Sequence, residues 1–333
     1  RMTTLRMCLL VLVGVIAACS QVSPPVDTSG WRGASAPDAD VSTDNRQVLR
    51  QLVGAEGLTP LLSEPASDLP LFALGRALFF DPILSGNLDQ SCAGCHRMDQ
   101  FTTDGRSLSA GTASVEQGGV RVPGPEHRFT PRNTPALFNL GHPSVRSMFW
   151  DRRLENNAQG VVVLHDSAYE ATGIERLRYD SDQVSLQTMQ AMLPVLVRDE
   201  MRGEHGDRDI RGNANILATV SDGDFESVWS LLVDRLMRID AYREMFALAF
   251  VELAPEQLHF QHAARALAHF MEFAFATPGS PWSLFLGGDD TSMDDAQVRG
   301  ALLFYTDAGC HGCHGGDLLT DDGVYEGLKG TSA

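Results

Sequence analysis

The chain has 333 residues, of which 43% are hydrophobic, enough for two domains of ordinary size with cores of their own. Its formal net charge of -17 and its isoelectric point near 4.9 exclude nucleic acid and anionic lipid as partners, because both would repel it. A basic protein or a neutral small molecule is a better-matched partner.

The first 19 residues predict an export signal. Arg1 and Arg6 give a positive start, and the apolar run from Cys8 to Ala18 is too short to span a bilayer. The run ends in Ile-Ala-Ala-Cys, which resembles the bacterial lipobox and predicts acylation of Cys19. No aspartate follows this cysteine, so a periplasmic lipoprotein anchored in the outer membrane is expected. A plain secretory signal is the alternative, and both predict export.

Residues 20–68 predict a tether and linker ahead of the folded part. Ser, Pro, Asp and Gly are frequent between Gln21 and Asp44, with little periodicity, which is typical of a flexible connection. Beyond the linker the pattern predicts a mainly α fold, with helices joined by long loops and without a convincing alternating strand pattern.

Three helices are indicated by their residue patterns. The first follows the candidate caps Asp222 and Asp224, and its apolar residues recur at helical spacing: Phe225, Val228, Trp229, Leu232, Leu236 and Ile239. The second is expected to start after Pro255 and to end at residues 277–279. The third begins with a capping-box pattern at residues 292–295 and runs toward Cys310.

Four of the six cysteines form two copies of one motif. Cys92-Ala93-Gly94-Cys95-His96 and Cys310-His311-Gly312-Cys313-His314 fit the Cys-x-x-Cys-His pattern of c-type haem attachment. The two thiols reach the two vinyl groups of one macrocycle, and the adjacent histidine then lies beneath the iron. His96 and His314 are therefore expected as proximal ligands. A zinc or redox Cys-x-x-Cys followed by a chance histidine is the alternative, but it would have to arise twice in one exported chain.

The two motifs lie in opposite halves of the chain, and no sequence repeat is detectable between them. This spacing predicts two cytochrome c-like haem domains, residues 69–215 and residues 216–333. Two covalently bound c-type haems are the expected cofactors.

Several short segments surround the first motif in a recognisable order. They are Leu74-Gly75-Arg76-Ala77-Leu78-Phe79-Phe80-Asp81-Pro82, Leu84-Ser85-Gly86-Asn87, Phe101-Thr102-Thr103-Asp104-Gly105-Arg106, Arg132-Asn133-Thr134-Pro135 and Phe149-Trp150-Asp151. Together they resemble the N-terminal half of the bacterial di-haem cytochrome c peroxidase and MauG family. The resemblance resumes at residues 190–194, at Glu200-Met201 and from Pro255 to Asp317.

The resemblance implies that one haem takes electrons from a donor, while the N-terminal haem cleaves hydrogen peroxide. Gln190 matches the family's active-site glutamine, and Glu200 matches its acid/base glutamate at the family's spacing of ten. Trp150 matches the interhaem tryptophan. Cleavage of the O–O bond requires a proton moved from one peroxide oxygen to the other, which a buried carboxylate can do while an amide orients the peroxide.

Composition leaves other interpretations of these residues open. Glu200 lies in a polar run that is typical of a solvated surface, and Trp150 can be a core aromatic. Asn133 matches a side chain that binds calcium between the two domains of the family. An asparagine before Thr-Pro is equally typical of a turn.

The sequence departs from the family at the distal side of the first haem. In relatives with two histidines on that haem, the second histidine follows Ser-x-Gly, but here Thr112 follows Ser109-Ala110-Gly111. His127 is a candidate for a displaceable replacement ligand, and a solvated loop histidine is the alternative. Without that ligand, the haem is expected to be open without reductive activation.

Two further departures concern length. The segment from Leu154 to Met189 is longer than in the compact peroxidases and is expected to reshape access to the active haem. The chain stops at Ala333, whereas the family continues into a tail that supplies the second haem's sixth ligand. With arginine at position 1, this predicts a fragment or an incomplete gene, and a truncated C-terminal domain.

These features predict an enzyme that reduces hydrogen peroxide to water with electrons from a small c-type cytochrome. The acidic surface is expected to attract a basic donor. One alternative is MauG-like oxidation of tyrosine or tryptophan side chains in a partner protein. Another is a non-enzymatic di-haem electron carrier or redox sensor. Membrane contact is expected only through the lipid anchor, and no nucleic acid is expected.

Overall fold

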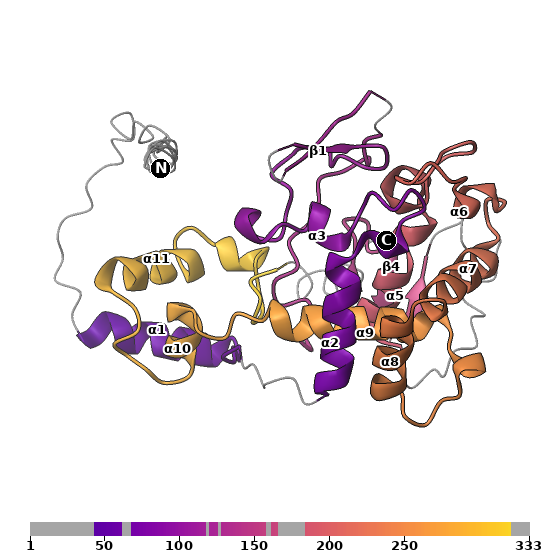
Figure 1. Cartoon of the computed structure of the whole chain (residues 1–333). Helices are drawn as coiled ribbons and strands as arrows, with labels where there is room; N and C mark the ends of the chain where they lie inside the picture. Colours follow the sequence, from indigo (N-terminus) through magenta and orange to yellow (C-terminus); the bar gives the residue numbers. More distant parts are fainter. Residues whose placement is uncertain are drawn as a thin grey trace, which may run out of the picture. The chain divides into compact units, whose positions relative to one another are not determined.

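The structure is a computed structural model, and it describes residues 43–61, 68–117, 120–125, 128–157, 161–165 and 184–320. Cys19 and His127 lie outside the described residues, so the predictions made for them are not addressed by the structure. The described part is mainly helical, which confirms the predicted fold class at that level (Figure 1). None of its helices combines the length and the apolarity that a membrane crossing requires.

The core is built around helix α2 (Leu69–Phe80), which packs against α9 (Phe260–Ala274). Figure 1 shows the two helices crossing, and α9 also packs against α5 (Leu186–Met192). The carboxylate of Asp68 accepts the Leu71 N–H at 3.0 Å and so caps the start of α2. At the crossing stands Gly75, where a Cβ atom would lie 1.9 Å from the carbonyl oxygen of Ala266. Only glycine lets the two backbones approach this closely.

Two more helices complete this core. Helix α7 (Phe225–Met237) begins as predicted after Asp224, whose carboxylate accepts the Ser227 N–H, and buries Val228, Trp229, Leu232 and Leu236. It ends two residues before Ile239, which instead precedes α8 (Asp240–Ala249). Helix α8 was not among the three helices predicted from the sequence. The predicted helix after Pro255 is split into η7 (Pro255–Gln257) and α9.

The remaining helices lead to the second cysteine motif. Helix α11 (Asp295–Tyr305) is capped by Asp294 in a capping box with Gln297, two residues later than the box predicted at residues 292–295, and it precedes η8 (Cys310–Gly312). Helix α1 (Thr43–Ala55) packs against α11, and α10 (Pro281–Leu286) precedes α11 in the chain. Arg46 and Arg50 on α1 form ion pairs with Asp295 and Asp290, both at 2.7 Å.

The fold also contains short strands, for which no alternating pattern was evident in the sequence. Strands β1 (Val115–Gln117) and β2 (Val120–Val122) form an antiparallel pair. A second antiparallel sheet has the order β3 (Ser147–Met148), β4 (Leu154–Asn156) and β5 (Val162–Leu164). Strands of two or three residues are too short to show a period of two in the sequence.

Short helical elements make up the first motif and the connections between the core helices. They are η1 (Pro82–Leu84), α3 (Cys92–Cys95), η2 (Met98–Gln100), η5 (Pro194–Leu196), the π-helical turn η6 (Arg198–Arg202) and α6 (Ile216–Thr219). The hydrophobic core itself combines residues from Leu71 to Phe275. The division into haem domains at residues 215 and 216 stays a prediction.

Candidate functional site

The first motif forms a single helical turn that directs His96 inward. The His96 N–H donates to the carbonyl oxygen of Cys92 at 2.8 Å, and His96 Nδ1 lies 3.0 Å from the carbonyl oxygen of Thr102. A carbonyl oxygen only accepts, so Nδ1 carries the hydrogen and Nε2 keeps its lone pair for a metal. Burial lowers the pKa of His96 from its ordinary value, which favours the neutral imidazole that ligates iron.

A small, mainly apolar cavity lies beside this histidine. Its lining includes Cys92 and His96 from the first motif, Phe79 from α2, Gln190 from α5 and Leu267 from α9. Gln190 and His96, which are 94 positions apart in the sequence, therefore line one space.

Glu200 lies at the middle of the π-helical turn η6 and is part-buried. Burial raises the pKa of its carboxyl to about 7. The pKa of Cys92 is raised to about 12 and that of Cys95 to about 11, mainly by burial. The charge of Glu200 contributes to both shifts, so its carboxylate lies near both thiols. Among the described residues no side chain or backbone group forms a hydrogen bond with this carboxyl. Glu200 is therefore not on a fully solvated surface, where composition alone placed it.

The structure does not bring Trp150 and Asn133 into the cavity. Trp150 is 66% exposed, with the guanidinium carbon of Arg132 3.9 Å from its ring centre, so the core-aromatic interpretation is wrong. Asn133 is exposed. Within the described ranges, no group of three or more His, Cys, Asp or Glu side chains is arranged to hold a metal ion. The roles of Trp150 in electron transfer and of Asn133 in calcium binding stay predictions.

The second motif repeats the backbone turn of the first. The His314 N–H donates to the carbonyl oxygen of Cys310 at 2.9 Å, which matches the bond from His96 to Cys92 at 2.8 Å. Cys313 and His314 are exposed, while Cys310 is part-buried. The backbone therefore supports attachment of a haem at both motifs.

Thr112 occupies the position where some relatives have a second histidine ligand. It is fully buried, its N–H donates to the carbonyl oxygen of Asp199 at 2.9 Å, and its hydroxyl donates to that of Arg198 at 3.3 Å. At the preceding Gly111, a Cβ atom would lie 1.8 Å from the Asp199 oxygen. The loop is thus bound to the backbone of the turn that carries Glu200.

Several residues at the site were not singled out by sequence reasoning. The carbonyl oxygen of Thr102 orients His96, and Phe79 lies with its ring centre 6.4 Å from that of the imidazole. Both stand in segments that carried the family resemblance. Met201 and Met271 also line the cavity, but a methionine in an apolar pattern carries no signal that separates it from ordinary core.

The residues of this site fit a c-type haem. Cys92 and Cys95 are free thiols, the imidazole of His96 is held with Nε2 available, and the adjoining cavity is apolar. A zinc site would need further ligands, and none of the required clusters occurs among the described residues.

Replacing both Cys92 and Cys95 by alanine is expected to halve the covalently bound haem, because only Cys310 and Cys313 would remain for attachment. Haem staining after denaturing electrophoresis and intact-mass measurement report the number of haems per chain. An unchanged count would contradict the assignment of the first motif. The matched variant with alanine at Cys310 and Cys313 should lose the other haem.

Comparison with known proteins gives consistent matches. A model of the di-haem cytochrome c peroxidase family matches residues 70–291. Methylamine utilization protein MauG of Methylophilus methylotrophus is 27% identical over 267 residues, 80% of this chain and 58% of the relative. Cytochrome c551 peroxidase of Pseudomonas aeruginosa is 27% identical over 261 residues, 78% of this chain and 54% of the relative.

A crystal structure of a MauG-like protein associated with microbial copper homeostasis aligns with a TM-score of 0.48 and 23% identity. The alignment covers 79% of this chain and 57% of that one. The chain therefore spans somewhat more than half the length of these relatives. The family match includes the first motif, Gln190 and Glu200, and it ends before Cys310.

Proposed function

Because this chain belongs to the di-haem cytochrome c peroxidase family, we propose that it reduces hydrogen peroxide at the haem attached through Cys92 and Cys95. The observation that carries the proposal is the convergence of Gln190 and His96 on one apolar cavity, with Glu200 close to the cysteine thiols. The reaction consumes one peroxide, two electrons and two protons, and it yields two molecules of water. The electrons come from a small c-type cytochrome.

A haem held by Cys92, Cys95 and His96 would supply a redox-active iron as the source of electrons for the reduction of peroxide. Glu200 takes the proton from one peroxide oxygen and returns it to the other, which leaves as water. A carboxyl with a pKa of about 7 can do both at neutral pH. The amide of Gln190 orients the peroxide by hydrogen bonding, and the apolar walls limit the entry of other polar molecules.

The rest of the proposal concerns how electrons reach the first haem and where in the cell the protein is located. A second haem on Cys310, Cys313 and His314 would accept electrons from the donor, with Trp150 on the route between the haems. The net charge of -17 favours a basic donor. The proposal also includes calcium binding by Asn133. A lipid on Cys19 would anchor the protein in the outer membrane, with its folded part in the periplasm.

The test is turnover by the haem-loaded chain with a reduced small c-type cytochrome and hydrogen peroxide. Oxidation of the cytochrome in a ratio of two to each peroxide consumed is the expected result. Peroxide consumption without cytochrome oxidation, but with mass shifts on tyrosine or tryptophan of a partner protein, would favour MauG-like chemistry. Two irons that bind neither cyanide nor peroxide quickly would identify an electron carrier.

The position of Thr112 makes a further prediction about the resting state. Because residues 109–112 include no histidine and Thr112 is bound to the backbone of Asp199 and Arg198, we expect the first haem to be open when oxidised. We expect cyanide to bind the fully oxidised protein as fast as the half-reduced protein, as followed by stopped-flow absorbance. Slow binding that accelerates on half-reduction would instead indicate a displaceable ligand such as His127.

A further inference from the structure

The π-helical turn that carries Glu200 is held from outside along its backbone. Four of its five carbonyl oxygens accept hydrogen bonds from groups outside the turn. Arg198 O accepts from the Thr112 hydroxyl at 3.3 Å, Asp199 O from the Thr112 N–H at 2.9 Å, Met201 O from the Gly86 N–H at 2.7 Å, and Arg202 O from the Asn215 amide at 2.8 Å. A five-residue π turn has few hydrogen bonds of its own, so these outer partners define its position.

Side chains connect these partners into a closed ring. Arg128 donates to the Thr112 hydroxyl at 3.2 Å and to Asp207 Oδ2 at 3.0 Å. Asn87 donates to the same oxygen of Asp207 at 3.1 Å, and Asn215 donates to Asn87 Oδ1 at 2.8 Å. Since Thr112 and Asn215 bind the two ends of the turn, the ring closes through η6 itself. We call Thr112, Arg128, Asp207, Asn87 and Asn215 the distal ring.

Asp207 is the junction of the distal ring. Its Oδ2 accepts three hydrogen bonds, from Asn87, from Arg128 and from the Glu204 N–H at 2.9 Å, just beyond the turn. Burial alone would raise the pKa of Asp207, but these hydrogen bonds hold it below its ordinary range. Asp207 is therefore ionised at neutral pH and pairs with Arg128 while largely shielded from water.

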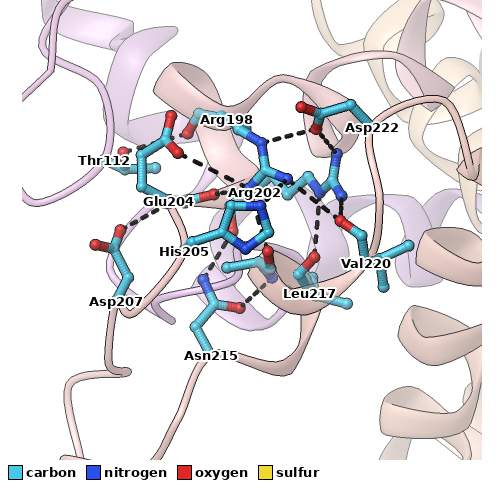
Figure 2. Close-up of polar contacts among 12 residues, drawn as sticks. Thr112, Arg198, Arg202, Glu204, His205, Asp207, Asn215, Leu217, Val220 and Asp222 are labelled. Atoms are coloured by element: carbon cyan, nitrogen blue, oxygen red, sulfur yellow. Dashed lines mark hydrogen bonds and ion pairs between the residues drawn. The ribbon is translucent and has the colours of Figure 1, made fainter.

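Two arginines fasten the same turn to the loop after α6. Figure 2 shows Arg198 and Arg202 directed at Asp222, with ion-pair distances of 2.8 and 3.0 Å. Arg202 is the largest fully buried side chain of the described residues and also donates to the carbonyl oxygens of Leu217 and Ser221. The two arginines thus hold η6 through its side chains, and the distal ring holds it through its backbone.

We propose that the residues of the distal ring are positioning residues for Glu200, because they set the backbone of η6 and so aim its carboxylate at the peroxide site. This inference rests on the proposed function. The ring acts through geometry: burial is the cause that raises the pKa of Glu200, and no charge of the ring contributes to it. A misplacement of about 1 Å in a catalytic group can cost about 100-fold in rate.

The test replaces Asp207 by alanine in the haem-loaded full chain. The matched control is Asp209→Ala, since Asp209 lies in the same loop and its carboxylate accepts three hydrogen bonds, which come from Arg211 and Asn213 and not from the described members of the ring. The second-order rate of the reaction with hydrogen peroxide is measured for both, and again in the Glu200→Gln background. Amide hydrogen exchange of residues 198–203 gives a readout independent of activity.

In the parent background, Asp207→Ala is expected to lower the peroxide rate by about tenfold or more, and Asp209→Ala to leave it unchanged. In the Glu200→Gln background, Asp207→Ala should have no further effect, because the group that it positions is already lost. Hydrogen exchange in residues 198–203 should accelerate at least tenfold in Asp207→Ala, while exchange in α9 stays as in the parent.

An equal loss of rate in both backgrounds would overturn the inference, because Asp207 would then act independently of Glu200. Unchanged exchange in residues 198–203 would also overturn it. A parent protein that does not react with peroxide, or a Glu200→Gln variant as fast as the parent, would refute the proposed function and this positioning role with it. A reactive parent with a fully active Asp207→Ala variant would refute the distal ring alone.

Discussion

Glu200→Gln is expected to lower the second-order rate of the reaction with hydrogen peroxide by about 10²–10⁴-fold. The amide keeps the shape of the side chain but can neither accept nor return the proton. In the parent the carboxylate is the active form of the base, and its pKa is about 7. The rate should therefore fall as the pH drops through about 7, and it should level off above about 8. Stopped-flow absorbance of the haem across this range checks both expectations.

The Glu200→Gln variant should lose the pH dependence near 7 together with the rate. Glu204→Gln is the matched control. Glu204 lies four residues after Glu200, and its carboxylate is directed at the guanidinium of Arg198, 3.9 Å away. A Glu204→Gln variant with parental rate and pH profile is expected. Parental rates in Glu200→Gln would remove the carboxyl from the mechanism.

Glu200→Gln is expected to stabilise the folded chain above pH 7, although it slows the reaction. Burial raises the pKa of Glu200 in the folded chain, so between its unfolded and folded pKa values the folded state binds more protons than the unfolded state. Its contribution therefore becomes less favourable as the pH rises from about 4.5 to about 7. Above pH 7 the Glu200→Gln variant should unfold at a higher urea concentration than the parent, which also shows that its loss of rate is not a loss of fold.

Gly75→Ala is expected to lower the free energy of unfolding by about 1–3 kcal/mol. The added Cβ atom would meet the carbonyl oxygen of Ala266 at 1.9 Å and the Cβ of Phe270 at 2.8 Å. Neither neighbour is a flexible side-chain end, so α2 and α9 would have to separate. Urea unfolding of the haem-loaded protein should show a lower midpoint with an unchanged m-value.

Gly54→Ala is the control for this substitution, since Gly54 lies in α1 with nothing within 4 Å of an added Cβ. It should be neutral or should stabilise the chain by about 0.4–1 kcal/mol. Equal stability of the two alanine variants would contradict the packing of α2 on α9. Because Leu267 and Met271 of α9 line the cavity, Gly75→Ala should also shift the visible spectrum of the first haem.

Part of this site could be predicted from residue types and their spacing, because the interactions involved are local. A Cys-x-x-Cys-His motif needs only one short turn to present its ligands, and both motifs form the same backbone bond from histidine to the first cysteine. The cap Asp224 acts within three residues of itself, so the start of α7 followed from sequence, whereas the capping box of α11 lies two residues later than predicted. The family resemblance added Gln190 and Glu200.

Long-range contacts were decided only by the tertiary structure. The approach of Gly111 and Thr112 to Asp199, and the distal ring that joins Asn87 to Asn215, connect segments about 90 to 130 positions apart. Hydrogen bonds of this kind leave no periodic pattern, because each depends on how α2, α5 and α9 pack. The sequence by itself therefore predicted which groups would attach the haem, whereas packing decided which side chains line the cavity and where Glu200 lies.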